Sequence, residues 1–198
     1  MIARYRAVRI DLGTGDGRAV LAAAAADPEV LVIGVDANAS AMAEASRRAL
    51  RGGPSNAIFV AAGIERLPAA LTDIADRVTV NFPWGSLLRG LLTADAHMLA
   101  SVAAIMKPGA ALTILLSVTE HDRAAGPAVT ETGLLSRLVA PYAAAGLAIT
   151  GIAPVTATDV VAAGSSWGKR LGAGSKRIAW RVGARRVGEG EEKRYVVS

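Results

Sequence analysis

The residues with the clearest chemical potential form a glycine-rich stretch near the amino end. Residues 11–17 read Asp-Leu-Gly-Thr-Gly-Asp-Gly, which places three glycines at alternate positions between a β-rich run and an alanine-rich run. Without β-carbons the backbone here can turn tightly and let a ligand lie directly against it. The same spacing is also compatible with a tight strand-to-helix turn that binds nothing.

The spacing and charge of this loop differ from those of a dinucleotide-binding loop. The dinucleotide fingerprint is G-x-G-x-x-G, and here the third glycine arrives one residue early. Asp11 and Asp16 bracket the loop, and two carboxylates would repel a pyrophosphate held on backbone amides. They suit a ligand with a sulfonium and an ammonium group, so the loop favours S-adenosylmethionine over NAD. Its candidate cofactor residues are Asp11, Gly13, Thr14, Gly15, Asp16 and Gly17.

Further candidate cofactor residues follow later strand-like runs. Asp36 ends the run at 30–35, where acids of nucleotide-binding sheets accept hydrogen bonds from ribose hydroxyls. Gly63, Ile64 and Glu65 come after the third run, where backbone groups could meet an adenine edge. The predicted S-adenosylmethionine site is therefore extended by Asp36, Ala37, Gly63, Ile64, Glu65, Asn81 and Ser86.

An aromatic stretch at 81–91 follows the β-rich run at 77–80. The end of a strand is where open α/β sheets place their sites, and this strand delivers Phe82, Pro83 and Trp84 there. A tryptophan beside a proline is also a common packing arrangement. Taken alone, the stretch leaves both interpretations open.

The charge of the chain is concentrated at its carboxyl end. The formal net charge is +5 and the pI is near 10.1. From Lys169 onward there are nine lysines and arginines against three acids, whereas the preceding residues carry 13 basic against 14 acidic side chains. Because these charges flank a tryptophan and several glycines, we read them as an edge that faces a polyanion rather than as a solvated tail.

Composition argues against several other classes of protein. There are no cysteines, and the two histidines, His97 and His121, lack metal-ligand spacing, so we predict no metal site. Apolar runs are too short for a membrane span and the amino end lacks the apolar core of a signal peptide. These observations predict a cytoplasmic protein.

Strand-like and helix-like runs alternate along the chain, which predicts an α/β fold. Strand-like runs lie at 8–12, 30–35, 57–61, 78–81, 111–118, 147–152 and 177–182. Helix-like runs lie at 18–26, 39–51, 94–106, 130–145 and 156–163. We expect a mostly parallel seven-stranded sheet with helices on both faces. We read 1–198 as one domain, with linkers at about 82–93, 119–130 and 156–176 and a basic tail at about 185–198.

These motifs together closely resemble one family, the aminoglycoside-resistance methyltransferases that modify adenine N1 in the decoding site of 16S rRNA, the kanamycin–apramycin type. The similarity spans essentially the whole chain. Its most specific part is Pro-Trp-Gly-Ser-Leu-Leu at 83–88, with a second tryptophan in Ser-Ser-Trp at 165–167. The other matching stretches are 11–17, 65–68, Arg170 and Arg177.

The resemblance implies a class I S-adenosylmethionine-dependent methyltransferase with a Rossmann-like fold that acts as a monomer on the 30S subunit. Trp84 and Trp167 would sandwich a flipped adenine, with Phe82 and Pro83 shaping the wall and Ser165 positioning Trp167. The residues implied to contact rRNA are Arg47, Arg48, Arg51, Ser165, Lys169, Arg170, Lys176 and Arg177. The family normally carries a β-hairpin before its first strand, whereas here about half a dozen residues precede that strand.

Two other functions stay open at this point. One is a methyltransferase that acts on another RNA, on a protein or on a small molecule, and the other is a non-catalytic RNA-binding relative. The chain shows no grouping of a nucleophile, a histidine and an acid. Such a grouping is not needed for methylation at adenine N1, because the neutral base already directs a lone pair outward.

Overall fold

A seven-stranded sheet organises the chain. The computed structural model describes residues 2–117, 131–164, 168, 170, 172–174 and 179–188. Its strands are β1 (Ala7–Leu12), β2 (Val30–Asp36), β3 (Ala57–Ala61), β4 (Ala75–Asn81), β5 (Met106–Leu116), β6 (Leu147–Pro154) and β7 (Trp180–Arg186). They lie in the order β3-β2-β1-β4-β5-β7-β6, and β7 runs antiparallel to both of its neighbours. The strand order reverses between β1 and β4, which is where open α/β sheets bind their ligands.

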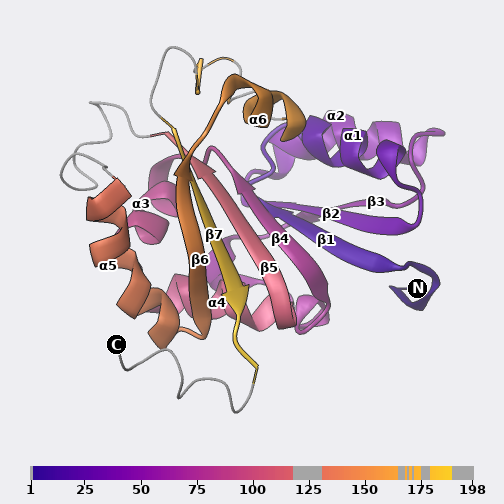
Figure 1. The fold of residues 1–198 in the computed structure, drawn as a ribbon. Coiled ribbons are helices and arrows are strands. Elements are labelled where there is room, and N and C mark those ends of the chain that lie inside the picture. Colours follow the sequence, from indigo (N-terminus) through magenta and orange to yellow (C-terminus); the bar gives the residue numbers. More distant parts are fainter. Residues whose placement is uncertain are drawn as a thin grey trace.

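Helices cover both faces of this sheet (Figure 1). They are α1 (Arg18–Ala26), α2 (Ala39–Leu50), α3 (Gly85–Thr93), α4 (Ala96–Ile105), α5 (Glu131–Ala144) and α6 (Ala157–Ala162). Short 3₁₀ turns lie at Ile2–Arg4, Ile64–Arg66 and Ala69–Leu71. Within the described ranges no single helix is long and apolar enough to cross a membrane, although the bent pair of α3 and α4 together passes that test.

The main core lies between one face of the sheet and helices α3, α4 and α5. Alternate residues of each strand point into it, among them Ile10 of β1 and Ile114 of β5, both fully buried. Leu99 of α4 and Tyr142 of α5 pack against them, and the Tyr142 hydroxyl donates a hydrogen bond to the Leu91 carbonyl at 3.1 Å. This bond satisfies the polar end of an otherwise buried aromatic side chain.

The opposite face is covered in two separate places. Val20 and Ala24 of α1 pack on Val32 of β2, and Val160 of α6 packs in a second cluster over the carboxyl ends of β4 and β5. Between these two covers the sheet carries exposed side chains, as at Arg77 and Ala111. The end of the sheet that α6 covers is also the end that carries the loops after β1, β2 and β4 (Figure 1).

The predicted α/β class and the mostly parallel seven-stranded sheet are confirmed. The bounds of several elements differ from the predictions. Residues 85–93, predicted as part of a linker, form helix α3, whose Leu88, Leu91 and Leu92 face the core. The last strand was predicted at 177–182 but extends to Arg186, because Val182 and Ala184 point inward alternately with Arg181 and Arg185. That alternation was hidden by the arginines, so the predicted tail begins inside β7.

We expect Gly17→Ala to destabilise the fold strongly. Gly17 precedes α1 with φ near 70°, and a β-carbon there would lie 2.6 Å from the Phe59 ring and 2.7 Å from the Ala45 β-carbon. Left-handed backbone costs an alanine about 1–2 kcal/mol, and overpacking adds about 1–3 kcal/mol. Gly109→Ala is the matched control, because Gly109 has φ near 79° with open space around it. Urea denaturation should show the larger loss for Gly17→Ala, and equal losses would contradict the packing argument.

Candidate functional site

Two adjoining cavities lie at the carboxyl ends of β1, β2 and β4. Their volumes are about 190 and 280 Å³, and both are lined by Gly13 and Trp84. We call the smaller one the loop cavity and the larger one the strand-end cavity. Because they share two lining residues, one extended ligand can occupy both.

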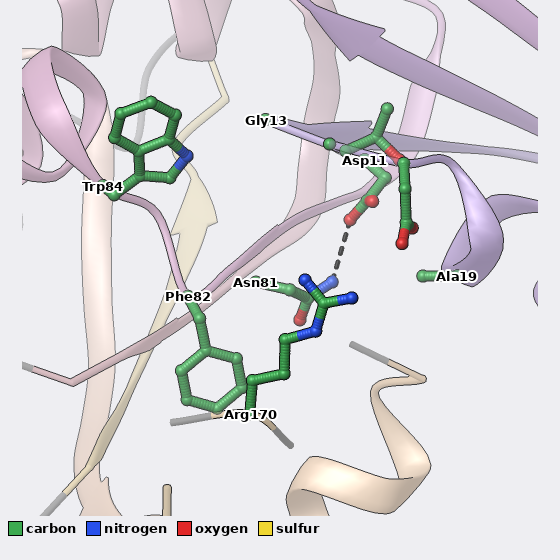
Figure 2. Close-up of a pocket in the computed structure, with 10 residues that line it drawn as sticks. Asp11, Gly13, Ala19, Asn81, Phe82, Trp84 and Arg170 are labelled. Atoms are coloured by element: carbon green, nitrogen blue, oxygen red, sulfur yellow. Dashed lines mark hydrogen bonds between the residues drawn. The ribbon is translucent and has the colours of Figure 1, made fainter. Parts of the chain in front are cut away.

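The loop cavity gathers residues from the glycine loop, from β4 and from the segment after α6 (Figure 2). Its lining is Asp11, Gly13, Thr14, Gly15, Asp16, Ala19, Asn81, Phe82, Trp84 and Arg170. Figure 2 shows the guanidinium group of Arg170 extending toward Asn81, on the same side as the carboxylate of Asp11. The cavity therefore presents carboxylates and one guanidinium group to a ligand of mixed charge.

Asp11 is the buried carboxylate of this cavity. It is 3% exposed, and its Oδ1 accepts hydrogen bonds from Thr79 Oγ1 at 2.7 Å and from Asn81 Nδ2 at 2.8 Å. Burial raises the pKa of Asp11, while these hydrogen bonds and the charge of Arg9 act in the opposite direction. A cation in the cavity would favour the ionised carboxylate, so the position suits a positively charged ligand.

The glycine loop is held open by backbone contacts. The amides of Gly13 and Thr14 donate to the Val35 carbonyl at 2.8 and 3.1 Å, and the Gly15 amide donates to Asp36 Oδ2 at 2.8 Å. Gly15 has φ near 60°, and nothing lies within 4 Å of where its β-carbon would be. The loop therefore leaves room for a ligand against its backbone, as the alternating glycines predict.

The strand-end cavity contains the second half of the predicted cofactor residues. Its lining is Gly13, Asp36, Ala37, Asn38, Ala62, Gly63, Ile64, Glu65, Pro83, Trp84, Gly85, Ser86, Leu87 and Met98. Asp36 Oδ1 accepts a hydrogen bond from the Asn38 amide at 2.8 Å, which fixes the carboxylate beside the cavity. Each Asp36 oxygen accepts one backbone bond and keeps a further lone pair for ligand hydroxyls.

Of the 13 residues predicted to bind the cofactor, only Gly17 lines neither cavity. It packs beneath the loop against Phe59 and Ala45 instead. Sequence reasoning missed Ala19, Asn38, Ala62, Gly85, Leu87 and Met98. Asn38 carried a usable signal, because an asparagine two residues after a strand-end acid caps the next helix, and its side chain accepts from the Ala41 amide. Leu87 and Met98 carried none, since each reads as an ordinary core residue.

Trp84 is the exposed aromatic at the junction of the two cavities. It is 76% exposed, whereas Phe82 is 2% exposed and Pro83 is buried. Phe82 adopts φ near 53°, unusual for a bulky residue, and its amide donates to the Leu115 carbonyl at 2.7 Å. This kinked backbone turns the chain at the end of β4. Phe82 and Pro83 line the loop cavity and the strand-end cavity, respectively, beside the exposed Trp84.

The segment that carries the second predicted aromatic meets the same wall. Gly168 is buried, and a β-carbon there would lie within 2.5 Å of the Phe82 ring. The five predicted residues Trp167, Ser165, Lys169, Lys176 and Arg177 lie outside the described residues. Among the predicted rRNA contacts, Arg47, Arg48 and Arg51 are exposed at the end of α2, while Arg170 lines the loop cavity.

Comparison with known proteins identifies what this site resembles. Residues 1–186 match the family model described as NpmA: 16S rRNA (adenine(1408)-N(1))-methyltransferase. The 16S rRNA (adenine(1408)-N(1))-methyltransferase of Streptoalloteichus hindustanus is 34% identical over 88% of this chain and 85% of its own length. The enzyme of that name from Escherichia coli is 31% identical over 92% and 88%. A mutant of the Catenulisporales acidiphilia enzyme, solved with its cosubstrate SAM, superposes with a TM-score of 0.87 at 34% identity, covering 96% of this chain and 89% of that one.

We expect Asp11→Asn to weaken S-adenosylmethionine binding about tenfold to a hundredfold at neutral pH, as for the loss of a charged hydrogen-bond partner. The bound cation should lower the pKa of Asp11 below its raised value in the free protein, so binding releases a proton. Wild-type affinity should therefore rise with pH between the bound and free pKa values and level off above them. The variant should lack that rise.

Isothermal titration calorimetry in two buffers of different ionisation enthalpy measures both the affinity and the proton release. Asp76→Asn is the matched control, because Asp76 is a strand carboxylate that lines neither cavity. An Asp11→Asn protein with wild-type affinity and proton release would refute the assignment.

Proposed function

Because the chain belongs to the 16S rRNA (adenine(1408)-N(1))-methyltransferase family, we propose that it methylates N1 of adenine 1408 in the 30S subunit and thereby confers aminoglycoside resistance. S-adenosylmethionine is the proposed methyl donor. The observation that carries the proposal is the junction of two adjoining cavities at one exposed tryptophan, Trp84. We further propose that the whole chain acts as a single-domain monomer in the cytoplasm, where 30S subunits are found.

The two cavities match the two chemical halves of the donor. The loop cavity, with Asp11, Asp16 and Arg170, suits the amino-acid half, which carries an ammonium and a carboxylate group. The strand-end cavity suits the nucleoside half, with Asp36 accepting from ribose hydroxyls and Ile64 forming part of an apolar wall. When bound, S-adenosylmethionine supplies an electrophilic methyl group on its sulfonium sulfur. Gly13 and Trp84 line both cavities and so mark the junction at which that methyl group would lie.

Arg170 receives a revised role in this proposal. The resemblance suggests that it grips rRNA, but its guanidinium group enters the loop cavity beside Asn81 (Figure 2). In that cavity the carboxylates of Asp11 and Asp16 can hold an ammonium group, and among the described lining residues Arg170 is the one cation. A guanidinium fork matches the two oxygens of a carboxylate. We therefore assign Arg170 to the cofactor carboxylate.

The target base must leave the RNA stack before its N1 can reach the junction. Extrusion costs a few kcal/mol, and stacking on an aromatic side chain returns about 1–3 kcal/mol per base. The exposed face of Trp84 can supply one such surface. The contact between Gly168 and Phe82 brings the chain next to Trp167 to the same wall, which supports Trp167 as the second surface.

The reaction itself needs positioning more than acid or base chemistry. Neutral adenine has an outward lone pair at N1, so this nitrogen attacks the methyl carbon directly and the sulfur keeps the electron pair of the broken bond. Within the described residues, no three histidines or acids gather as metal ligands. The buried wall of Phe82 and Pro83 fixes Trp84, and an aligned base can gain most of the rate through orientation alone.

The central test is methylation of purified 30S subunits by the wild-type protein, followed by primer extension along 16S rRNA. We expect a methylation-dependent stop at adenine 1408. Trp84→Ala should reduce the rate about fivefold to 150-fold because the flipped base loses a stacking surface of about 1–3 kcal/mol, with S-adenosylmethionine affinity unchanged. Trp84→Phe should keep part of the activity. Methylation by Trp84→Ala at the wild-type rate would refute the stacking role, and methylation of free RNA or protein alone would refute the substrate.

Arg170→Ala should weaken S-adenosylmethionine binding about tenfold in the absence of any RNA, since a charged hydrogen-bond partner of the carboxylate is lost. Arg170→Lys should recover part of that affinity, because it keeps the charge without the fork. Arg89→Ala is the matched control, since Arg89 is exposed on α3 and lines neither cavity. If calorimetry shows unchanged cofactor affinity while 30S binding falls, Arg170 contacts rRNA instead.

A further inference from the structure

A third cavity lies on the sheet away from the proposed active site. Its volume is about 360 Å³, and it opens near the amino ends of β1, β2 and β4, beside the last turn of α1. Its lining is Arg6, Ala7, Val8, Arg9, Ala23, Asp27, Val30, Val32, Asp76 and Arg77. We call it the arginine cleft. It shares no residue with the two cavities at the other end of these strands.

The acidic side chains of the arginine cleft already have partners. Asp27 pairs with Arg6 at 2.7 Å, at the edge of the cleft. Asp76 accepts from the Val8 amide through one oxygen and from Lys107 through the other, each at 2.7 Å. Asp27, Asp76 and Arg6 are therefore matched within the protein. The charge that the cleft can offer to a ligand comes from its other two arginines.

Arg9 and Arg77 are those two unmatched cations. They are direct neighbours across the parallel pair of β1 and β4, so their α-carbons lie about one strand spacing, roughly 4.8 Å, apart. Neither side chain forms a hydrogen bond or an ion pair with any residue in the described ranges. The Nε of Arg9 is buried and has no hydrogen-bond partner there, an arrangement that ordinarily destabilises a protein.

The interaction between Arg9 and the Asp11 carboxylate does not explain why Arg9 and Arg77 lie side by side without partners. The charge of Arg9 does act on the Asp11 carboxylate, but the hydrogen bonds to Asp11 come from Thr79 and Asn81. Arg77 is exposed. It lies two residues before Thr79 on β4, and Thr79 is the residue directly opposite Asp11. Two adjacent guanidinium groups with free donors thus face the cleft together, beside the apolar surface of Val30 and Val32.

We propose that the arginine cleft binds a phosphate of the rRNA backbone, remote from the methylated nucleotide. Two guanidinium groups at strand spacing can hold the oxygens of one phosphate, and the apolar wall can accept the adjoining sugar. This inference rests on the proposed function, because the substrate particle is a polyanion that the cleft complements in charge.

The arginine cleft lies apart from the junction at Trp84, so its proposed contact with a phosphate is separate from the proposed contact of Trp84 with the target base. Arg77 lies four residue steps along β4 from Asn81 of the loop cavity, a distance of roughly 13 Å. Thr79, which lies between them on this face, is buried, whereas the row across the sheet at Arg77 continues through the exposed Ala111 of β5 to Arg185 of β7. A neighbouring RNA strand can therefore lie across this face while the flipped base occupies the junction at Trp84.

The first test measures 30S binding and methylation by Arg77→Gln and Arg9→Gln across a salt series. Each variant should weaken 30S binding about fivefold to tenfold and reduce the salt slope by about one, and Arg77→Gln should leave kcat and cofactor affinity unchanged. Arg77→Gln is decisive, because a change at Arg9 also removes the charge that acts on Asp11. Arg137→Gln on α5 is the matched control, an exposed arginine of the helix layer on the other face of the sheet.

The second test uses the absence of cysteine from the chain. Arg77→Cys provides a single attachment point for a photo-crosslinker, and Arg137→Cys provides the control. We expect Arg77→Cys to crosslink to 16S rRNA within 30S subunits and the control to give no such product. Crosslinks only to ribosomal proteins, or wild-type affinity and salt slope for Arg77→Gln, would overturn the arginine cleft while leaving the methylation proposal intact. Failure of wild-type methylation would instead refute the function itself.

Discussion

The hydrogen bonds from Thr79 and Asn81 to the buried carboxylate of Asp11 are the interactions on which the site depends. They join the ends of β1 and β4, the two strands between which the sheet order reverses. The glycine loop starts two residues after Asp11, and the aromatic stretch starts at Asn81 itself. One acid therefore connects the end of β1, where the glycine loop begins, to the end of β4, where the aromatic stretch begins. Burial raises the pKa of Asp11, and the same two hydrogen bonds act against that rise by favouring the ionised carboxylate that a cationic ligand needs.

The aromatic wall shows how packing can support an exposed functional side chain. Trp84 is largely exposed, which would be an unfavourable place for a tryptophan with only a structural role. Phe82 and Pro83 are buried directly before it, and the left-handed backbone of Phe82 turns the chain so that Trp84 projects outward. Phe82 is buried in a cluster with Leu115, Val160 and Ala173, and this packing offsets the free-energy cost of its left-handed backbone. Rigid support and exposure are thus produced by consecutive residues.

The distribution of charge separates two uses of arginine in this chain. Arg170 lies in a cavity with two acids and can complete the recognition of a zwitterionic ligand. Arg9 and Arg77 lie in a cleft whose acids are already paired, so their charge remains available to an outside anion. The net charge of the whole chain does not distinguish these cases. The two cases differ in whether the carboxylates beside each arginine already have partners within the protein.

The sequence by itself determined the sheet, the glycine loop and 12 of the residues that line the two cavities, because each of these depends on local patterns. Strand periodicity, alternate glycines and acids at strand ends are readable along a single segment. The tertiary structure alone decided that 85–93 is a helix, that β7 reaches Arg186, and that Arg170 enters the loop cavity. It also decided that Arg9 and Arg77, 68 residues apart in the chain, stand side by side. These features depend on which strands become neighbours, and pairing between distant segments leaves no signal in either segment alone.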